Sequence, residues 1–343
     1  MMRRRSIALA VTLALGAAVS GCAGEDGGAS KAADTCSSGP VTVGYLPKLG
    51  TDPYMTTLRD GAKAAAEEIG GEVVYTAPSE ATGAAQIPFV NQLIAQKVGA
   101  IVISGSDLNG AAAALRKARR AGIKVISVDS DVATDARSLF VNQAKTSELG
   151  AKMLDSMAEL IGHKGEFAVL SSTETAVNQN AWIEDMKSRL ATDPKLKDMK
   201  LVTVAYGQEK ADVNAQKAKS LVQAYPKLKG IIVPAGIGLP AAAEALSQTG
   251  DLGRVKLTGL APASLIKKYI RGGDVQDIWW NVHDLGGLSY HAAQALAQCK
   301  VKAEPGERIP AGELGTYTVG ERGEVVLGPA TVVTPKNIDD FEF

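Results

Sequence analysis

Short apolar segments alternate with amphipathic helical segments along this chain from Pro40 almost to its end. The segment 100–104 reads AIVIS, and the segment 53–69 carries small and apolar residues at helical spacing. Continuously apolar strands that alternate with helices predict parallel sheets that are covered by helices on both faces. The expected strands lie at 41–46, 72–76, 100–104, 124–128, 166–170, 201–205, 230–233, 255–260 and 275–279.

The alternation starts a second time after residue 142, and about 300 residues follow Pro40, a length that usually splits into two domains. We therefore expect an α/β fold of two doubly wound parallel-sheet lobes, joined by three crossovers that act as hinges. The boundaries that we expect are 40–142 plus 282–312 for the first lobe and 143–281 plus 313–343 for the second. Near the end of the chain, the segments 315–319 and 325–327 predict a hairpin that turns at 320–323.

The N-terminus is organised like a secretory signal. Arginines at positions 3–5 precede an apolar run at 7–19, and small residues then lead to Cys22. The end of this run resembles a bacterial lipobox, which implies a lipoprotein signal peptide at 1–22 and a lipid on Cys22 that anchors the protein to the cell membrane, outside the cytoplasm. Residues 23–39 carry no large apolar side chain and predict a flexible tether.

Two further cysteines, Cys36 and Cys299, follow the lipobox cysteine. Outside the cytoplasm such a pair can form a disulfide, or the two thiols can be unrelated. The sequence does not place them within bonding distance of each other. We favour a bridge that pins the start of the fold to a late helix.

The composition argues against several classes of function. The chain has 37 basic and 37 acidic residues without a long run of one sign, which argues against a nucleic-acid partner.

The sequence also lacks the patterns of metal and cofactor sites. The three histidines are scattered and lack the spacing of metal ligands: His163, His283 and His291. The segment 236–241 is similar to the start of a dinucleotide fingerprint, but no acidic residue closes a following strand. We expect no metal, no cofactor and no enzymatic activity.

The residues that follow the predicted strands indicate a binding cleft. Ligands of open parallel sheets bind beyond the carboxyl ends of the strands, and two facing lobes enclose a cleft there. Sugar hydroxyls need hydrogen-bond donors and acceptors together, and the apolar face of a sugar ring packs on aromatic side chains. The strand-end residues offer that mixture: Lys48, Asp129, the segment 171–179, the segment 234–236, Trp280 and Asn281.

Two of these candidates have alternative interpretations. Asp129 could serve a turn, which aspartate favours, and Lys48 could be a solvated surface lysine. We favour ligand roles for both residues. For Asp131, two positions after Asp129, we expect a structural role.

Several stretches in order along the chain resemble the sugar-binding proteins of ABC importers, of the type I periplasmic binding protein fold. They are YLPKLG (45–50), KVISVDSD (124–131), NQNAWIEDMK (178–187), LKGIIVPAGIGLPAAAEAL (228–246), VKLTGLAPAS (255–264), IWWNVHDLGG (278–287) and GERIPAGELGT (306–316). Within that class the chain is most similar to rhamnose-binding proteins and next to autoinducer-2-binding proteins. The resemblance implies a monomer that delivers a small sugar to an ABC permease.

The same resemblance implies which residues contact the ligand. They are Lys48, Tyr54, Asp129, Asn178, Gln179, Pro234, Gly236, Trp280 and Asn281. Autoinducer-2 binders carry an acidic residue where this chain has Asn178, so we favour a rhamnose-like deoxyhexose and keep autoinducer-2 or another pentose or hexose as the alternative. A lipoprotein that senses a sugar without transporting it is a further alternative.

Overall fold

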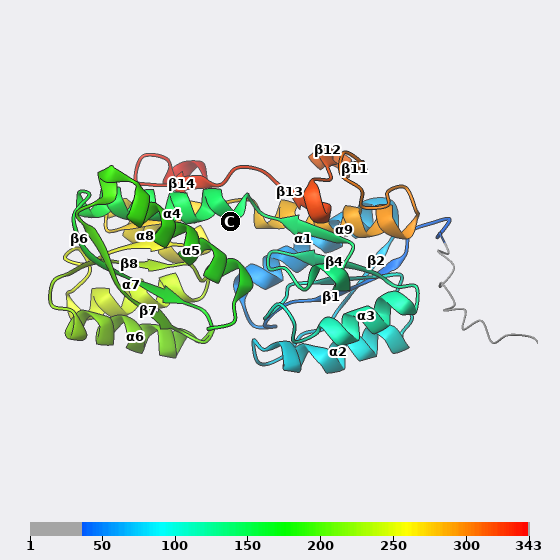
Figure 1. Cartoon of the computed structure of the whole chain (residues 1–343), viewed down its shortest axis with the longest axis horizontal. Helices are drawn as coiled ribbons and strands as arrows, with labels where there is room; N and C mark the ends of the chain where they lie inside the picture. The colour runs from blue at the N-terminus through cyan, green and yellow to red at the C-terminus, as the bar shows by residue number, and fades with distance from the viewer. Residues whose placement is uncertain (1–35, 342–343) are drawn as a thin grey trace, which may run out of the picture. The chain divides into compact units, whose positions relative to one another are not determined.

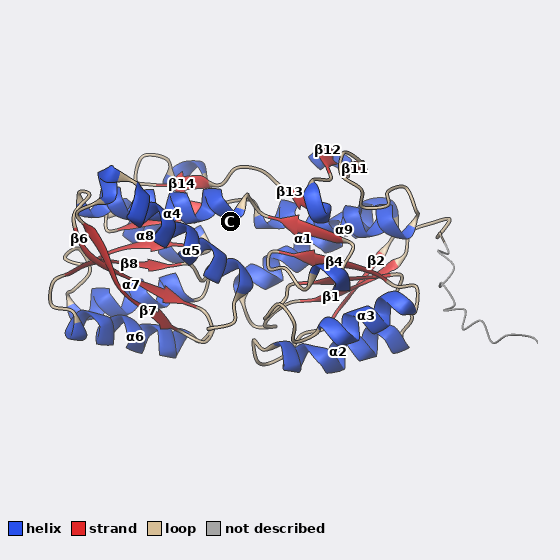
Figure 2. Cartoon of the chain, in the orientation of Figure 1, coloured by secondary structure: helices blue, strands red, loops and turns tan. Residues whose placement is uncertain are grey.

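The computed structural model describes residues 36–341 (Figures 1 and 2). The predictions for the signal peptide 1–22, for Cys22 and for the tether up to residue 35 lie outside the described residues. Within 36–341, no helix combines the length and the apolar character that a membrane crossing requires.

The first lobe is built on a six-stranded parallel sheet in the order β13-β5-β4-β3-β1-β2. Its strands are β1 (Thr42–Leu46), β2 (Glu72–Tyr75), β3 (Ala100–Ile103), β4 (Lys124–Val128), β5 (Leu139–Asn142) and β13 (Glu324–Val326). Its helices are α1 (Pro53–Ile69), α2 (Gly83–Ala95), α3 (Ala112–Arg120) and α9 (Val282–Ala297), and a small hairpin pairs β11 (Arg308–Pro310) with β12 (Thr316–Thr318).

The second lobe repeats this plan in the order β14-β10-β9-β8-β6-β7, in which only β14 runs antiparallel to its neighbour β10. Its strands are β6 (Gly165–Ser171), β7 (Met199–Tyr206), β8 (Leu228–Val233), β9 (Lys256–Gly259), β10 (Val275–Trp279) and β14 (Thr331–Val333). Its helices are α4 (Thr146–Ile161), α5 (Val177–Thr192), α6 (Ala211–Ala224), α7 (Gly238–Thr249) and α8 (Ala263–Arg271). All nine strands expected from the sequence are present, and the predicted fold class is confirmed.

Alternate residues of each central strand face opposite layers of helices. In β3, Ile101 and Ile103 pack with α2 and α3, whereas Val102 packs on the other face with α1 and α9. Figure 1 shows α2 and α3 along one face of the first sheet. In the second lobe, α6, α7 and α8 cover one face and α4 and α5 the other. Both faces are therefore buried, which explains the uninterrupted apolar strands of the sequence.

Two predictions about the end of the chain were wrong. The segment around β13 does not form a hairpin with the segment 315–319, because β12 pairs with β11 and β13 pairs in parallel with β5. The assignment of 313–343 to the second lobe therefore fails for its first part, and the third crossover lies between β13 and β14. Strands of three residues carry too few apolar positions to show which sheet they will join.

Helices α1 and α9 approach closely enough that glycine is required at their contact. A Cβ atom on Gly286 would lie 1.9 Å from the carbonyl oxygen of Leu58 in α1. We expect Gly286→Ala to lower the free energy of unfolding by about 1–3 kcal/mol, because the helices must move apart. Gly287→Ala is the matched control, since the nearest atom to its Cβ would be in the flexible Leu314 side chain, at 3.3 Å, and its other neighbours would lie at ordinary contact distances. Urea unfolding of both variants tests this, and equal losses would contradict it.

Asp277 is a fully buried carboxyl group in β10. Its Oδ1 accepts a hydrogen bond from the backbone N–H of Ala261 at 3.0 Å, and burial raises the pKa of Asp277 well above its usual range. The carboxyl group of Asp277 loses its proton above about pH 4 in the unfolded chain but keeps it to a higher pH in the folded chain. The free energy of unfolding therefore falls by about 1.4 kcal/mol for each pH unit between these two pKa values.

We expect Asp277→Asn to remove this penalty, because an amide keeps the shape and the acceptor of the protonated acid. The variant should have a higher free energy of unfolding than the wild type at pH 7.5, and this difference should shrink as the pH falls and close near pH 4. Asp274→Asn, which removes a 2.6 Å ion pair with Lys256, should instead be slightly less stable at pH 7.5. A loss of stability in Asp277→Asn at both pH values would refute the expectation.

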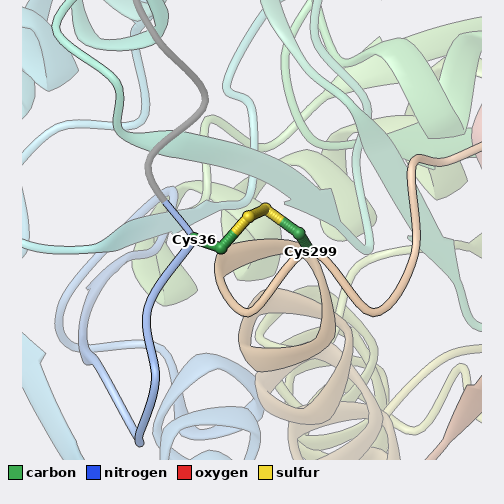
Figure 3. Close-up of a disulfide and its surroundings, with 2 residues drawn as sticks. All are labelled: Cys36 and Cys299. Atoms are coloured by element: carbon green, nitrogen blue, oxygen red, sulfur yellow. A yellow bond between two sulfur atoms is a disulfide. The ribbon is translucent and has the colours of Figure 1, made fainter.

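A disulfide joins the start of the first lobe to the segment that follows α9. Cys36 and Cys299 are bonded across 263 positions of sequence, with their Cα atoms 5.4 Å apart (Figure 3). Beside the bridge, the backbone N–H of Ser37 donates to the carbonyl of Ala297 at 2.9 Å. The favoured interpretation of the two cysteines is thus confirmed.

Candidate functional site

The carboxyl ends of the strands of both sheets meet at one small cavity of about 30 Å³. Every ligand residue expected from the sequence except Asn281 lines it. The first lobe contributes Lys48, Asp52, Tyr54, Met55 and Asp129, and the remaining lining residues are Asn178, Gln179, Trp182, Glu209, Pro234, Ala235, Gly236, Leu260 and Trp280.

Asp129 makes most of the polar contacts on the first-lobe side. It follows β4 with a φ of 62°, a left-handed conformation that aspartate tolerates better than most residues. Its Oδ2 accepts a hydrogen bond from the Ser104 hydroxyl at 2.9 Å and lies 3.3 Å from Lys48 Nζ. Its Oδ1 accepts a hydrogen bond from the Tyr54 hydroxyl at 3.2 Å. Asp129 and Lys48 are both buried, so Lys48 is not a solvated surface lysine.

Tyr54 and Trp280 form the aromatic part of the cavity. The Trp280 indole N–H donates to the Tyr54 hydroxyl at 3.2 Å, and the rings meet edge to face with centroids 6.1 Å apart. Burial, followed by the charge of Asp129, raises the pKa of Tyr54 well above its usual value. The phenol therefore stays neutral and serves as a hydrogen-bond donor to Asp129.

The second lobe presents two amide side chains from the start of α5. Gln179 Oε1 accepts hydrogen bonds from the Ser171 hydroxyl at 2.7 Å and the Ser172 backbone N–H at 2.8 Å. Its carbonyl is thus committed to the strand-end loop, and its amide nitrogen is the group that it can offer to a ligand. Asn178 Oδ1 accepts a hydrogen bond from Lys48 Nζ at 3.3 Å, which links the two lobes directly.

Gly236 and Pro234 belong to the loop that joins β8 to α7. A Cβ atom on Gly236 would lie 3.4 Å from Tyr54 Cβ, in ordinary contact with the opposite lobe. The backbone of this loop therefore borders the cavity without a side chain between them. This geometry agrees with the expectation that the glycine-rich stretch permits close approach of the backbone.

Two predicted residues have structural contacts instead of contacts with the cavity. Asn281 caps α9, because its Oδ1 accepts a hydrogen bond from the Asp284 backbone N–H at 3.1 Å. Asp131 forms a two-pronged ion pair with Arg137, at 2.6 and 2.7 Å. The structural role expected for Asp131 agrees with this pair, whereas Asn281, for which we expected a ligand role, caps a helix and does not line the cavity.

Two carboxyl groups of the cavity were missed in the sequence. Asp52 caps α1, where its Oδ1 accepts a hydrogen bond from the Tyr54 backbone N–H at 2.9 Å. Glu209 follows β7 with a φ of 52°. Burial, and next the charge of Glu209, raises the pKa of Asp52 to about 7. The strand-end rule would have found Glu209 had it been applied after the strand predicted at 201–205.

The cavity has room for about one water molecule. A sugar therefore fits only if the lobes separate, which breaks the contact between Lys48 and Asn178, and close again around it. Among the described residues, no group of three His, Cys, Asp or Glu side chains is placed to hold a metal ion. The arrangement of donors, acceptors and aromatic rings suits reversible binding of a polyhydroxylated molecule.

Comparisons with known proteins agree on one family. A family model described as periplasmic binding protein domain matches residues 43–301. A sugar ABC transporter from Actinomyces odontolyticus is 36% identical, with a TM-score of 0.71 over 88% of this chain and 97% of that chain. An ABC transporter solute binding protein from Clostridium phytofermentas with bound L-rhamnose is 32% identical, with a TM-score of 0.84 over 88% and 98%. The D-ribose/D-allose-binding protein of Pseudomonas aeruginosa is 24% identical over 244 residues, which are 68% of this chain and 74% of that protein.

Proposed function

Because the chain belongs to the periplasmic binding protein domain family, we propose that it binds a small monosaccharide between its lobes and delivers it to an ABC importer. The observation that carries this proposal is the cavity that both lobes line, where Lys48, Asp129 and Gln179 offer donors and acceptors beside the rings of Tyr54 and Trp280. Binding without chemical conversion is the role expected of this family.

A rhamnose-like deoxyhexose is the ligand that we favour. The solute binding protein from Clostridium phytofermentas, 32% identical to this chain, was solved with L-rhamnose. Asn178, which bonds Lys48 across the cleft, is an amide where autoinducer-2 binders carry an acid. A methyl group in place of one hydroxyl suits the apolar side chains of Met55, Trp182 and Leu260 around the cavity.

The partners follow from this role. We propose that the protein works outside the cytoplasm as a monomer, held at the membrane by a lipid on Cys22, and that a permease recognises the closed lobes. A sensory role, in which a receptor replaces the permease, is the alternative at this level.

Isothermal titration calorimetry tests the ligand class. The full chain, purified in mild detergent, is titrated with L-rhamnose, autoinducer-2, D-ribose, L-arabinose and D-galactose. We expect L-rhamnose to bind with a Kd of about 1 μM or tighter, corresponding to about −8 kcal/mol. If only autoinducer-2 or only D-ribose bound, the preferred ligand would be that molecule and the role in sugar binding would stand. The absence of binding heat with every sugar of the panel would contradict the proposal.

A further inference from the structure

Two carboxyl groups of the cavity have no partner of opposite charge. Asp52 of the first lobe and Glu209 of the second are each only 7% exposed. Asp52 caps its helix through Oδ1 alone. Within residues 36–341, Glu209 has neither a hydrogen bond nor an ion pair, although it lines the cavity.

The charges around this pair do not neutralise it. Lys48 is the basic residue of the cavity lining, and it already contacts Asp129 and Asn178. Asp52 is affected by the like charges of Glu209 and Asp129 and only weakly by Lys48. Tyr54 and Tyr75 are two further titratable groups on which the charge of Asp52 acts, and neither offers a positive charge. A buried carboxylate without donors is costly, so this arrangement needs donors from elsewhere.

We infer that Asp52 and Glu209 form an additional ligand subsite, which accepts hydrogen bonds from hydroxyl groups of a neutral sugar and excludes sugars that carry a carboxylate. The inference rests on the proposed function and adds the class of sugar. Hydroxyl groups are donors that a carboxylate can accept from, and the bonds to carboxylates are stronger than those to neutral acceptors. A sugar acid would bring a further negative charge into a site that already holds two unpaired carboxyl groups.

The position of the pair adds a second consequence. Asp52 lies before α1 and Glu209 lies after β7, so one ligand that bonds both bridges the two lobes. A ligand stabilises the closed state only through contacts that the open state lacks. Loss of either carboxylate should therefore weaken binding, even though its removal also relieves repulsion between the lobes.

Calorimetry with matched variants and two probe sugars tests this subsite. The full chain is compared as wild type, Asp52→Asn and Glu209→Gln, with L-rhamnose and with L-mannuronate, which has a carboxylate in place of the rhamnose methyl group. Asn keeps the acceptor that caps α1, and Gln keeps the shape of Glu209. Glu67→Gln is the control, because Glu67 is an exposed carboxylate of α1 that lines neither the cavity nor the groove beside Glu209.

We expect each cavity variant to bind L-rhamnose about ten- to thirty-fold more weakly, and the preference for L-rhamnose over L-mannuronate to fall at least ten-fold. The control should match the wild type in both respects. If Asp52 and Glu209 had only a structural role, their variants would have a lower melting temperature than the wild type and the same preference between the two sugars.

The outcomes separate this inference from the proposed function. If the wild type binds L-rhamnose and both variants bind it equally well or more tightly, the subsite is wrong and the sugar-binding role stands. If the wild type binds no sugar of the panel, the proposed function fails and the subsite fails with it.

Discussion

Asp129→Asn is expected to weaken sugar binding about 100-fold, or about 2.7 kcal/mol. The amide keeps the size of the side chain and tolerates the φ of 62° at this position, so the backbone need not change. It cannot balance the charge of Lys48, whose Nζ lies 3.3 Å from Oδ2 in a buried setting. Leaving one buried charge without its partner costs several kcal/mol.

Asp131→Asn is the control for this experiment. Asp131 lies two residues on and holds Arg137, so its substitution should lower the melting temperature and leave the affinity within about three-fold. Calorimetry with the tightest-binding sugar and thermal unfolding of both variants make the comparison. If Asp131→Asn lost binding and Asp129→Asn retained it, Asp129 would not be the main polar contact of the site.

Replacing both cysteines of the disulfide by serine is expected to lower the free energy of unfolding by about 2–5 kcal/mol. The bridge closes 263 positions of sequence, and long loops gain the most when the unfolded chain is constrained. The doubly substituted Cys36→Ser/Cys299→Ser protein avoids a free thiol, and urea unfolding of the full chain measures the loss.

Sugar affinity should stay within about two-fold in the same variant. Cys36 of the bridge precedes the amino end of β1, whereas the cavity lies beyond the carboxyl end of β1, where Lys48 lines it. Hydrogen bonds between Gln294 of α9 and both backbone groups of Val41 hold the start of β1 independently. Equal urea midpoints for the variant and the oxidised wild type would show that the bridge adds nothing to stability.

The sequence determined the elements of this fold because their signals are local. The spacing of apolar residues inside a segment indicates whether it forms a strand or a helix, so β3 and α1 could be located from their own residues. The rule that ligands bind at strand ends then led from β4 to Asp129 and from β1 to Lys48, and the structure brings both to the cavity. These inferences needed no knowledge of which residues approach each other in space.

Tertiary structure decided what depends on contacts between distant segments. Strand β13 joins the first sheet by pairing with β5, about 180 residues earlier, and its three residues contain no signal for that partner. Asp52 has the sequence pattern of an ordinary helix cap, and its pKa is raised to about 7 because the tertiary structure buries it and places Glu209 of the other lobe near it. The residues of a site can be predicted from the sequence when they lie at strand ends. The pKa values and charge interactions of these residues depend on the distances between the two lobes and on burial, which only the tertiary structure determines.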